Sequence, residues 1–291
     1  MLPQPKVNTN PLSQWMRQPK IYISLPSKGH YWQEDSIIWP ETNELAVYSM
    51  TARDELLFKT PDALMNGQAI VDVIQSCIPN IKNAWECPTI DLDTILVAIR
   101  LATYGEKMPF KFTVPNTSEE IEYEIDLRVL LDQQSQNYWH DEIEINQELI
   151  VYVNPLTYKH LSKTNLKSFE TNRILNMVND DSIPDDKKLE IFNQSFNSLT
   201  KISVDLLAES IYKIVTPQGE VKNKSFIVEF INNVDKKIFQ QIQDHIKNLK
   251  THNDIKPLEF TSTPEQIELG APETYSIPVT FNNSDFFGQG F

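Results

Sequence analysis

Cysteine is scarce in this sequence of 291 residues, which contains only Cys77 and Cys87. Two thiols cannot build the disulfide framework that stabilises small secreted domains. A zinc site would need further ligands, and the sequence offers none at a suitable spacing beside these two cysteines. Cys77 falls on the apolar side of an expected helix, where cysteine behaves as a small hydrophobic residue. We therefore expect a cytosolic protein without a metal or other cofactor.

Glycine is scarce as well, with seven residues in the whole chain. A loop that holds phosphate groups needs glycines between a strand and a helix. The one Gly-x-Gly pattern, Gly288–Gly290, is at the chain end and no helix follows it. The patterns G-x-S-x-G and H-E-x-x-H are absent. These absences leave a nucleotide site and an enzyme activity without support, so we predict no catalytic residues.

The basic residues include few arginines, five among 26, and the 40 acidic residues bring the net charge to −14. Such a negative field repels nucleic acid and anionic membranes, and arginine is the preferred reader of phosphates and base edges. The N-terminus lacks the apolar region of a signal peptide. No stretch approaches the roughly 20 apolar residues of a membrane span. We predict neither nucleic-acid binding nor a membrane span.

Hydrophobic periodicity is the positive signal in this chain. Apolar alternation and Pro- or Gly-containing turns indicate strands, and apolar spacing of three or four residues with capping residues indicates helices. The expected strands are 20–26, which runs into a turn at Ser27–Gly29, 44–50, a hairpin at 110–127, 149–153, and further β structure over 257–281. The expected helices begin at Thr51, at Thr60 and at Ile90, and helical patterns continue over about 157–256.

Two of the expected helices have a recognisable apolar face. Gly67 falls within the apolar stripe of the helix that begins at Thr60, where a missing side chain permits close packing. The long helix that opens with the capping-box pair Ser182 and Asp185 has apolar residues at regular helical steps. Those residues are Leu189, Phe192, Phe196, Leu199, Leu206, Ile211 and Ile214.

These elements predict an α+β fold. A mixed module with β-hairpins, residues 21–156 and 257–281, is interrupted by a predominantly helical module, residues 157–256. Residues 1–20 form an extended N-terminal arm and residues 282–291 an aromatic tail. Residues 112–127 and 260–281 share the order strand, turn, acidic stretch and strand. We expect these two hairpins to pair in space; the alternative is two unrelated hairpins.

The densest cluster of potentially catalytic residues is His140, Asp141 and Glu142. Histidine and carboxylates can bind a metal or transfer protons. Neighbouring side chains point in different directions unless the backbone bends, so we favour a solvated acidic turn. A metal-dependent hydrolase centred on these three residues is the alternative.

Several segments in order resemble a known family. They are "LPS-G" (25–29), the entry "MTARDELLF" (50–58), "LATYG" (101–105), "VNPLTY" (153–158) and the C-terminal "FF" (286–287). The chain resembles the baseplate hub proteins of contractile-tailed phages of the T-even type. This resemblance implies an interaction protein of virion morphogenesis, an assembly factor or a hub subunit, without a catalytic mechanism. Its partners would be other hub and tail proteins, in the host bacterial cytoplasm during assembly or in the baseplate of the virion tail.

The resemblance also bears on zinc. It implies that some members carry Cys-x-x-Cys pairs in the turns of the two hairpins. Here the turns 114–120 and 262–270 contain no cysteine. We therefore predict no metal, with packing between the hairpins in its place.

The tail "NNSDFFGQGF" (282–291) is the predicted partner-binding site. Phe286, Phe287 and Phe291 would dock on a partner, with Asp285 beside them and Gly288 allowing the chain to bend. The alternative is that the phenylalanines pack on this protein's own core. The N-terminal arm and exposed helix faces are the other expected contacts. A bacterial adaptor domain unrelated to phage remains the third reading of the chain.

Overall fold

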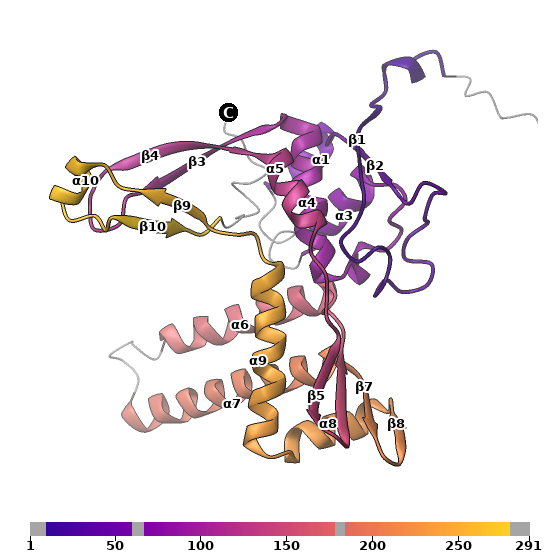
Figure 1. Ribbon diagram of the computed structural model, residues 1–291, viewed down its shortest axis with the longest axis vertical. Helices are drawn as coiled ribbons and strands as arrows, with labels where there is room; N and C mark the ends of the chain where they lie inside the picture. Colours follow the sequence, from indigo (N-terminus) through magenta and orange to yellow (C-terminus); the bar gives the residue numbers. More distant parts are fainter. Residues whose placement is uncertain (1–9, 60–66, 178–183, 280–291) are drawn as a thin grey trace, which may run out of the picture.

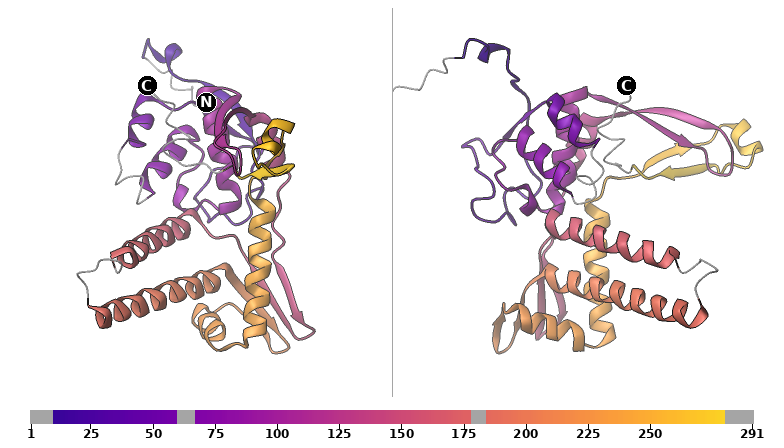
Figure 2. Two further views of the ribbon diagram at one scale, coloured as in Figure 1. Left: turned by 90° about the vertical axis from the view of Figure 1, so that its left-hand side faces the viewer. Right: turned by 180° about the vertical axis from the view of Figure 1, so that it is seen from behind.

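The computed structural model describes residues 10–59, 67–177 and 184–279. Helices occur together with small antiparallel sheets, so the predicted α+β class is confirmed. Figure 1 shows an upper body, a lower body around a four-stranded sheet, and a β arm that projects to one side. Two long helices, which we call the helical arm, also project from the molecule (Figure 2).

The upper body is formed by the N-terminal half of the chain. Ile74 of α3 and Ile95 and Ile99 of α4 are fully buried, and the antiparallel hairpin of β1 and β2 packs on α4. Burial on nearly all sides explains why α4 is apolar on most of its surface. The elements are β1 (Pro19–Ile23), β2 (Leu45–Tyr48), α1 (Ala52–Leu57), α3 (Gln68–Cys77), η2 (Ala84–Glu86), α4 (Thr89–Tyr104) and α5 (Leu127–Ser135), and the short η1 (Ser13–Trp15) precedes them in the N-terminal arm.

The start of α3 shows why Gly67 is glycine. Helix α3 begins at Gln68 with Gly67 as its N-cap, and Gly67 has a left-handed backbone, φ 79°. A Cβ at this position would lie 2.5 Å from the hydroxyl oxygen of Ser162 and 2.9 Å from that of Tyr158. The close packing expected at Gly67 is therefore confirmed. The expected helix start at Thr60 lies outside the described residues.

The lower body is an antiparallel sheet in the order β5-β6-β7-β8. Val151 and Ile211 from the sheet share a core with Ile227 and Ile242 from the helices. The elements are β5 (Glu142–Asn146), β6 (Leu149–Val153), β7 (Ile211–Thr216), β8 (Gly219–Val221), α8 (Lys224–Asn233) and α9 (Lys236–Asn253).

Strand β7 corrects the sequence analysis, which expected the long helix to continue through Ile211 and Ile214. The helix ends at Ser210, and β7 pairs with β6 in the sheet. Isoleucine is compatible with both periodicities, and the neighbouring strand decides the outcome. Because β5 and β6 share a sheet and a core with β7, we propose that the module boundary expected at 156/157 lies before β5.

The β arm consists of two hairpins that pack face to face. The ring centroids of Phe112 and Phe260 lie 4.7 Å apart, and Val114, Ala271 and Tyr275 are buried between the hairpins. The expected pairing of the two hairpins is therefore confirmed. The short helix α10 in the second turn was not predicted. The elements are β3 (Lys107–Thr113), β4 (Glu120–Asp126), β9 (Leu258–Thr261), α10 (Pro264–Glu268) and β10 (Thr274–Ile277).

The helical arm consists of α6 (Tyr158–Met177) and α7 (Asp185–Ser210). The two helices lie side by side and extend away from both bodies (Figure 2). Small buried residues, Thr171 of α6 and Ser195 of α7, allow the helices to approach closely. Ser182, expected to begin the second helix, lies outside the described residues.

Candidate interaction sites

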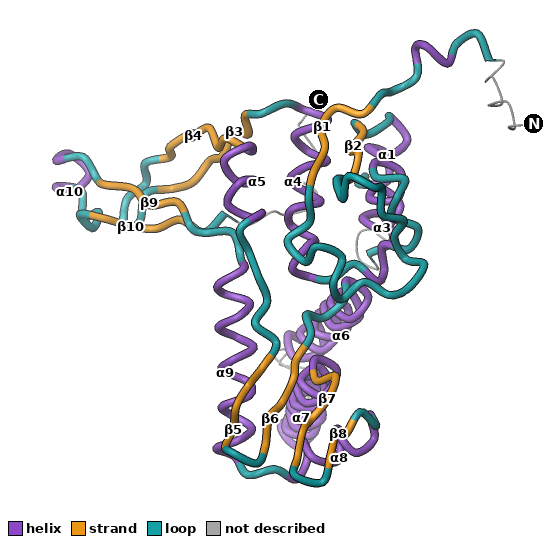
Figure 3. The backbone as a smooth tube through the Cα atoms, turned by 45° about the vertical axis from the view of Figure 1, so that its right-hand side comes forward, coloured by secondary structure: helices purple, strands orange, loops and turns teal. Residues whose placement is uncertain are grey.

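Three apolar side chains are exposed on the N-terminal arm, of which the structure describes residues 10–20. Leu12, Trp15 and Met16 lie on η1 or beside it, and Trp15 is 79% exposed. Figure 3 shows η1 standing away from the upper body. The arm is not extended throughout, because residues 13–15 form a turn of 3-10 helix and β1 begins at Pro19. Tryptophan is enriched at the energetic centres of protein interfaces, so this arm is a candidate contact for another protein.

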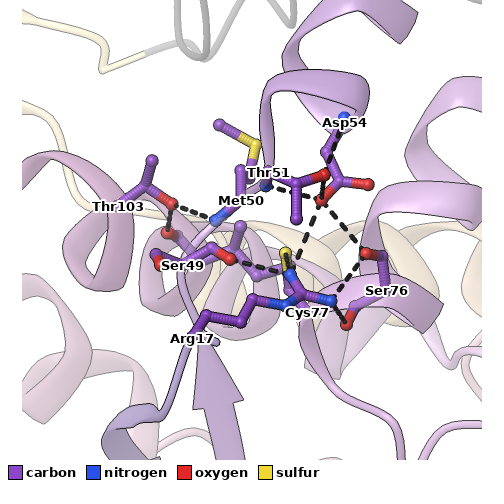
Figure 4. A network of polar contacts seen from close by, with 9 residues as sticks. Arg17, Ser49, Met50, Thr51, Asp54, Ser76, Cys77 and Thr103 are labelled. Atoms are coloured by element: carbon purple, nitrogen blue, oxygen red, sulfur yellow. Dashed lines mark hydrogen bonds and ion pairs between the residues drawn. The ribbon is translucent and has the colours of Figure 1, made fainter. Parts of the chain in front are cut away.

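Arg17 fixes the base of the arm to the upper body (Figure 4). Its guanidinium donates to the backbone oxygens of Ser49 at 2.8 Å and Ser76 at 2.7 Å. It also donates to the Ser76 hydroxyl at 3.0 Å and forms an ion pair with Asp54 at 3.6 Å. Ser76 lies in the last turn of α3, where free carbonyl groups and the helix dipole favour a cation. This arginine therefore fixes the point from which the arm leaves the body.

Asp54 is the buried carboxylate of the same network (Figure 4). It accepts hydrogen bonds from the Thr51 backbone N–H at 2.7 Å, the Thr51 hydroxyl at 2.8 Å and the Ser76 hydroxyl at 3.0 Å. The capping box predicted for Thr51 and Asp54 is confirmed. One carboxylate thus joins the start of α1, the end of α3 and the arm.

The N-terminal segment also differs in charge from the rest of the chain. Residues 1–33 contain no aspartate or glutamate, and their charged side chains are Lys6, Arg17, Lys20 and Lys28. Since the whole chain carries a net charge of −14, the negative charge lies beyond this segment. Because Arg17 is paired with Asp54, the arm around Leu12 and Trp15 carries neither negative charge nor a free arginine, so its exposed apolar residues fit an apolar pocket on a partner.

The "LPS-G" segment is held by a buried carboxylate of α4. Asp91 accepts hydrogen bonds from the backbone N–H of Ser27 at 2.8 Å and from the indole N–H of Trp32 at 2.7 Å, and the Ser27 hydroxyl donates to it as well. Burial raises the pKa of Asp91 from 3.8 to about 6, although the hydrogen bonds from Ser27 and Trp32 lower it. The loop and the start of α4 are therefore coupled to one titrating group.

Asp91 predicts a pH dependence of stability. A carboxyl with a raised pKa binds more protons in the folded protein than in the unfolded one, so the unfolding free energy should fall as pH rises from about 4 to about 6. A shift of this size corresponds to about 2–3 kcal/mol. Urea unfolding at several pH values gives the slope of the unfolding free energy against pH. This slope should be smaller for Asp91→Asn than for the natural chain. The pH slope is compared, and not the stability at one pH, because asparagine also weakens the hydrogen bond to Trp32. Equal slopes would contradict the assignment of this pH dependence to Asp91.

His140, Asp141 and Glu142 do not converge on one site. The ring of His140 lies beside that of His245 on α9, with centroids 6.2 Å apart. Asp141 accepts a hydrogen bond from the Tyr212 hydroxyl at 3.2 Å, and Glu142 accepts one from the Tyr152 hydroxyl at 2.9 Å. Burial, followed by the charge of Asp141, raises the pKa of Tyr212 to about 12. Each of the three side chains thus has its own partner. The expected acidic turn is not formed, because His140 and Asp141 lie in the loop before β5 and Glu142 is the first residue of that strand.

Cys77 and Cys87 are buried and free, and burial raises the pKa of the Cys77 thiol to about 12. Within residues 10–59, 67–177 and 184–279, no three His, Cys, Asp or Glu side chains form a group that could hold a metal.

Polar contacts join the two turns of the β arm. The Gln266 side chain donates to Glu119 at 3.1 Å, and the Asn116 amide donates to the backbone oxygen of Gly270 at 3.4 Å. Protein atoms therefore supply the contact between the turns.

The residues of the predicted tail site come after the last described residue, Val279. Phe286, Phe287, Phe291, Asp285 and Gly288 lie outside the described residues. Among the helices that are described, none combines the length and apolar character of a membrane span.

Arg17 was not singled out from the sequence, because its contacts reach residues 31 to 60 positions away. A usable signal was present in the chain: a segment without acidic residues that carries Leu12, Trp15 and Met16 at helical spacing.

Comparison with known proteins bears on the family of this chain. A family model described as "T4 bacteriophage base plate protein" matches residues 20–267. Neither the curated proteins nor the solved structures contain a match. The matched segment includes both bodies, the helical arm and most of the β arm. The phage resemblance of the sequence is therefore confirmed, and the chain belongs to the family of T4 bacteriophage base plate proteins.

Proposed function

We propose that this baseplate protein acts in the baseplate hub, as a structural subunit or as an assembly factor, through contacts with other hub and tail proteins. The observation that carries this proposal is the N-terminal arm, which presents Trp15 and Leu12 to solvent and is fixed to the body by Arg17. A ligand segment fixed at its base loses less conformational freedom on binding than a free one. Family membership supports a role in the phage tail.

The C-terminal tail is the second contact in this proposal. Phe286, Phe287 and Phe291 would enter an apolar groove of a partner, and Gly288 would allow the chain to bend. Burying one phenylalanine contributes roughly 1.5–3 kcal/mol, so two or three could offset the ordering of a short segment.

Quantitative mass spectrometry of purified particles and infected-cell lysate tests the hub role. A defined copy number in particles makes the protein a hub subunit. Absence from particles, with co-purification of hub precursors, makes it an assembly factor. Absence from both would overturn the hub proposal.

The role of the arm is tested in the same experiment with Leu12→Ser combined with Trp15→Ser. We expect this variant to lose its place in particles or its co-purification with hub precursors, because the apolar contact is gone. Phe226→Ser is the matched control, since Phe226 on α8 is also an exposed aromatic residue. Equal behaviour of the two variants would remove the arm from the proposal.

A further inference from the structure

Helix α7 carries a seam of regularly spaced residues, apolar except at two serines, whose distal part is exposed. Leu189, Phe192, Phe196, Leu199, Ser203, Leu206 and Ser210 follow one another in alternating steps of three and four residues. This is the heptad spacing with which one helix packs along another. The seam therefore has the pattern of a helix–helix contact.

Among residues 10–59, 67–177 and 184–279, other elements lie against the proximal end of the seam and leave its distal end exposed. Leu206 and Ser210 line a cavity between α7 and α9, and Ser210 is buried. The distal residues Leu189, Phe192 and Phe196 are 62%, 52% and 61% exposed. The Phe192 and Phe196 rings stack with centroids 6.5 Å apart. Large apolar side chains gathered in one exposed row mark an interaction surface.

The distal seam is complementary to itself. In an antiparallel pair of identical helices, residues at equal distances from the twofold axis face each other. With the axis at the level of residue 194, Phe192 faces Phe196 of the second copy and Leu189 faces Leu199. Each apolar residue of the exposed seam thus meets an apolar residue, and the pair of helical arms becomes a four-helix bundle.

The charges along the seam permit this pairing. A chain with net charge −14 repels its own copies, so self-association needs a neutral contact. Three residues that border the distal seam, Asn193, Ser195 and Thr200, are uncharged. Lys188 is the basic one, and in this register it faces Thr200 of the second copy. No like charges meet at the seam or at these bordering residues, since Lys187 and Lys201, which come level with each other in this register, lie off the seam.

We propose that the distal seam of α7 binds the same seam of a second copy in an antiparallel arrangement. The competing occupant within the chain is the C-terminal tail, whose phenylalanines at 286, 287 and 291 lack the alternation of three and four residues. The proposal does not depend on a role in the hub, because self-association and presence in particles are measured separately.

Sedimentation velocity of the full chain tests the proposal across a roughly hundredfold range of protein concentration, because dimer formation follows mass action. The expected mass at the upper end is twice 33.7 kDa. Phe192→Ser combined with Phe196→Ser should remain monomeric with an unchanged circular dichroism spectrum, since both rings are exposed. The control Phe226→Ser, from a residue that is 59% exposed on α8, should dimerise like the natural chain.

Cysteine crosslinking tests the register. Asn193 borders the seam, because it lies four residues after Leu189 and three before Phe196. Gln194 lies off the seam, because no seam residue is three or four positions away from it. Asn193→Cys should form an intermolecular disulfide under mild oxidation, and Gln194→Cys should not. The native Cys77 and Cys87 are buried and do not interfere.

Three results would overturn the proposal. One is a monomeric natural chain at every concentration. Another is a dimer that persists in the double serine variant. The third is dimerisation of a variant that lacks residues 280–291 when the full chain stays monomeric, because the tail would then be what covers the seam in the full chain.

Discussion

Replacing Gly67 by alanine is expected to lower the free energy of unfolding by about 2–4 kcal/mol. A left-handed backbone costs a residue with a Cβ about 1–2 kcal/mol, and overpacking a filled site adds about 1–3 kcal/mol. The new Cβ would lie 2.5 Å from the Ser162 hydroxyl oxygen, which is far inside normal contact distance. Tyr158 cannot withdraw easily, because it is buried and stacks on Trp85 with ring centroids 5.6 Å apart.

Urea unfolding followed by circular dichroism measures this cost. The double variant Gly67→Ala with Ser162→Ala is the control, because it removes the closest atom and leaves the backbone strain. We expect it to recover part of the loss, and the recovered part reports how tightly α3 packs on the helical arm. A loss below about 1 kcal/mol for Gly67→Ala would contradict the close packing.

Replacing Phe112 by alanine is expected to separate the two hairpins of the β arm. Its ring lies 4.7 Å from that of Phe260 and 6.2 Å from that of Tyr275, so it joins β3 to both strands of the second hairpin. Loss of a buried phenylalanine costs about 3–5 kcal/mol, and Phe112 is partly buried, so we expect about 2–3 kcal/mol. A two-stranded hairpin is marginally stable alone. The second hairpin should therefore open locally.

Hydrogen exchange of the backbone amides in β9 and β10 measures this opening. Phe112→Ala should raise the exchange rates in these strands by roughly 10- to 100-fold and leave those of α4 unchanged, because α4 is buried in a different core. Phe226→Ala, at an exposed position, should leave both unchanged. Uniform loss of protection in β9, β10 and α4 would show that the β arm is not a separate unit.

Local chemistry explains which parts of the fold could be predicted. The Thr51–Asp54 cap, the turn at Ser27–Gly29 and the hairpin at 110–127 depend on residues within a few positions of one another. Capping, turn formation and strand alternation act over that range. The pairing of the two hairpins was also predicted, because both segments have the same order of strand, turn, acidic stretch and strand.

The candidate sites were harder to predict from the sequence than the fold. The tail with Phe286 and Phe287 could be named but lies outside the described residues. Arg17 was missed because all its partners are distant in the chain. The seam of α7 was found as a periodic row, but periodicity does not tell which part of a helix face another element covers.

The sequence by itself determined the α+β class, the local caps and turns, and the baseplate family, since each depends on short patterns. Only the tertiary structure decided that residues 211–216 form a strand beside β6, that Arg17 fixes the N-terminal arm, and that Phe192 and Phe196 stay exposed. The reason is physical. Hydrogen-bond geometry within one turn is set by adjacent residues, whereas burial and strand pairing depend on segments that the folded chain brings together from distant positions.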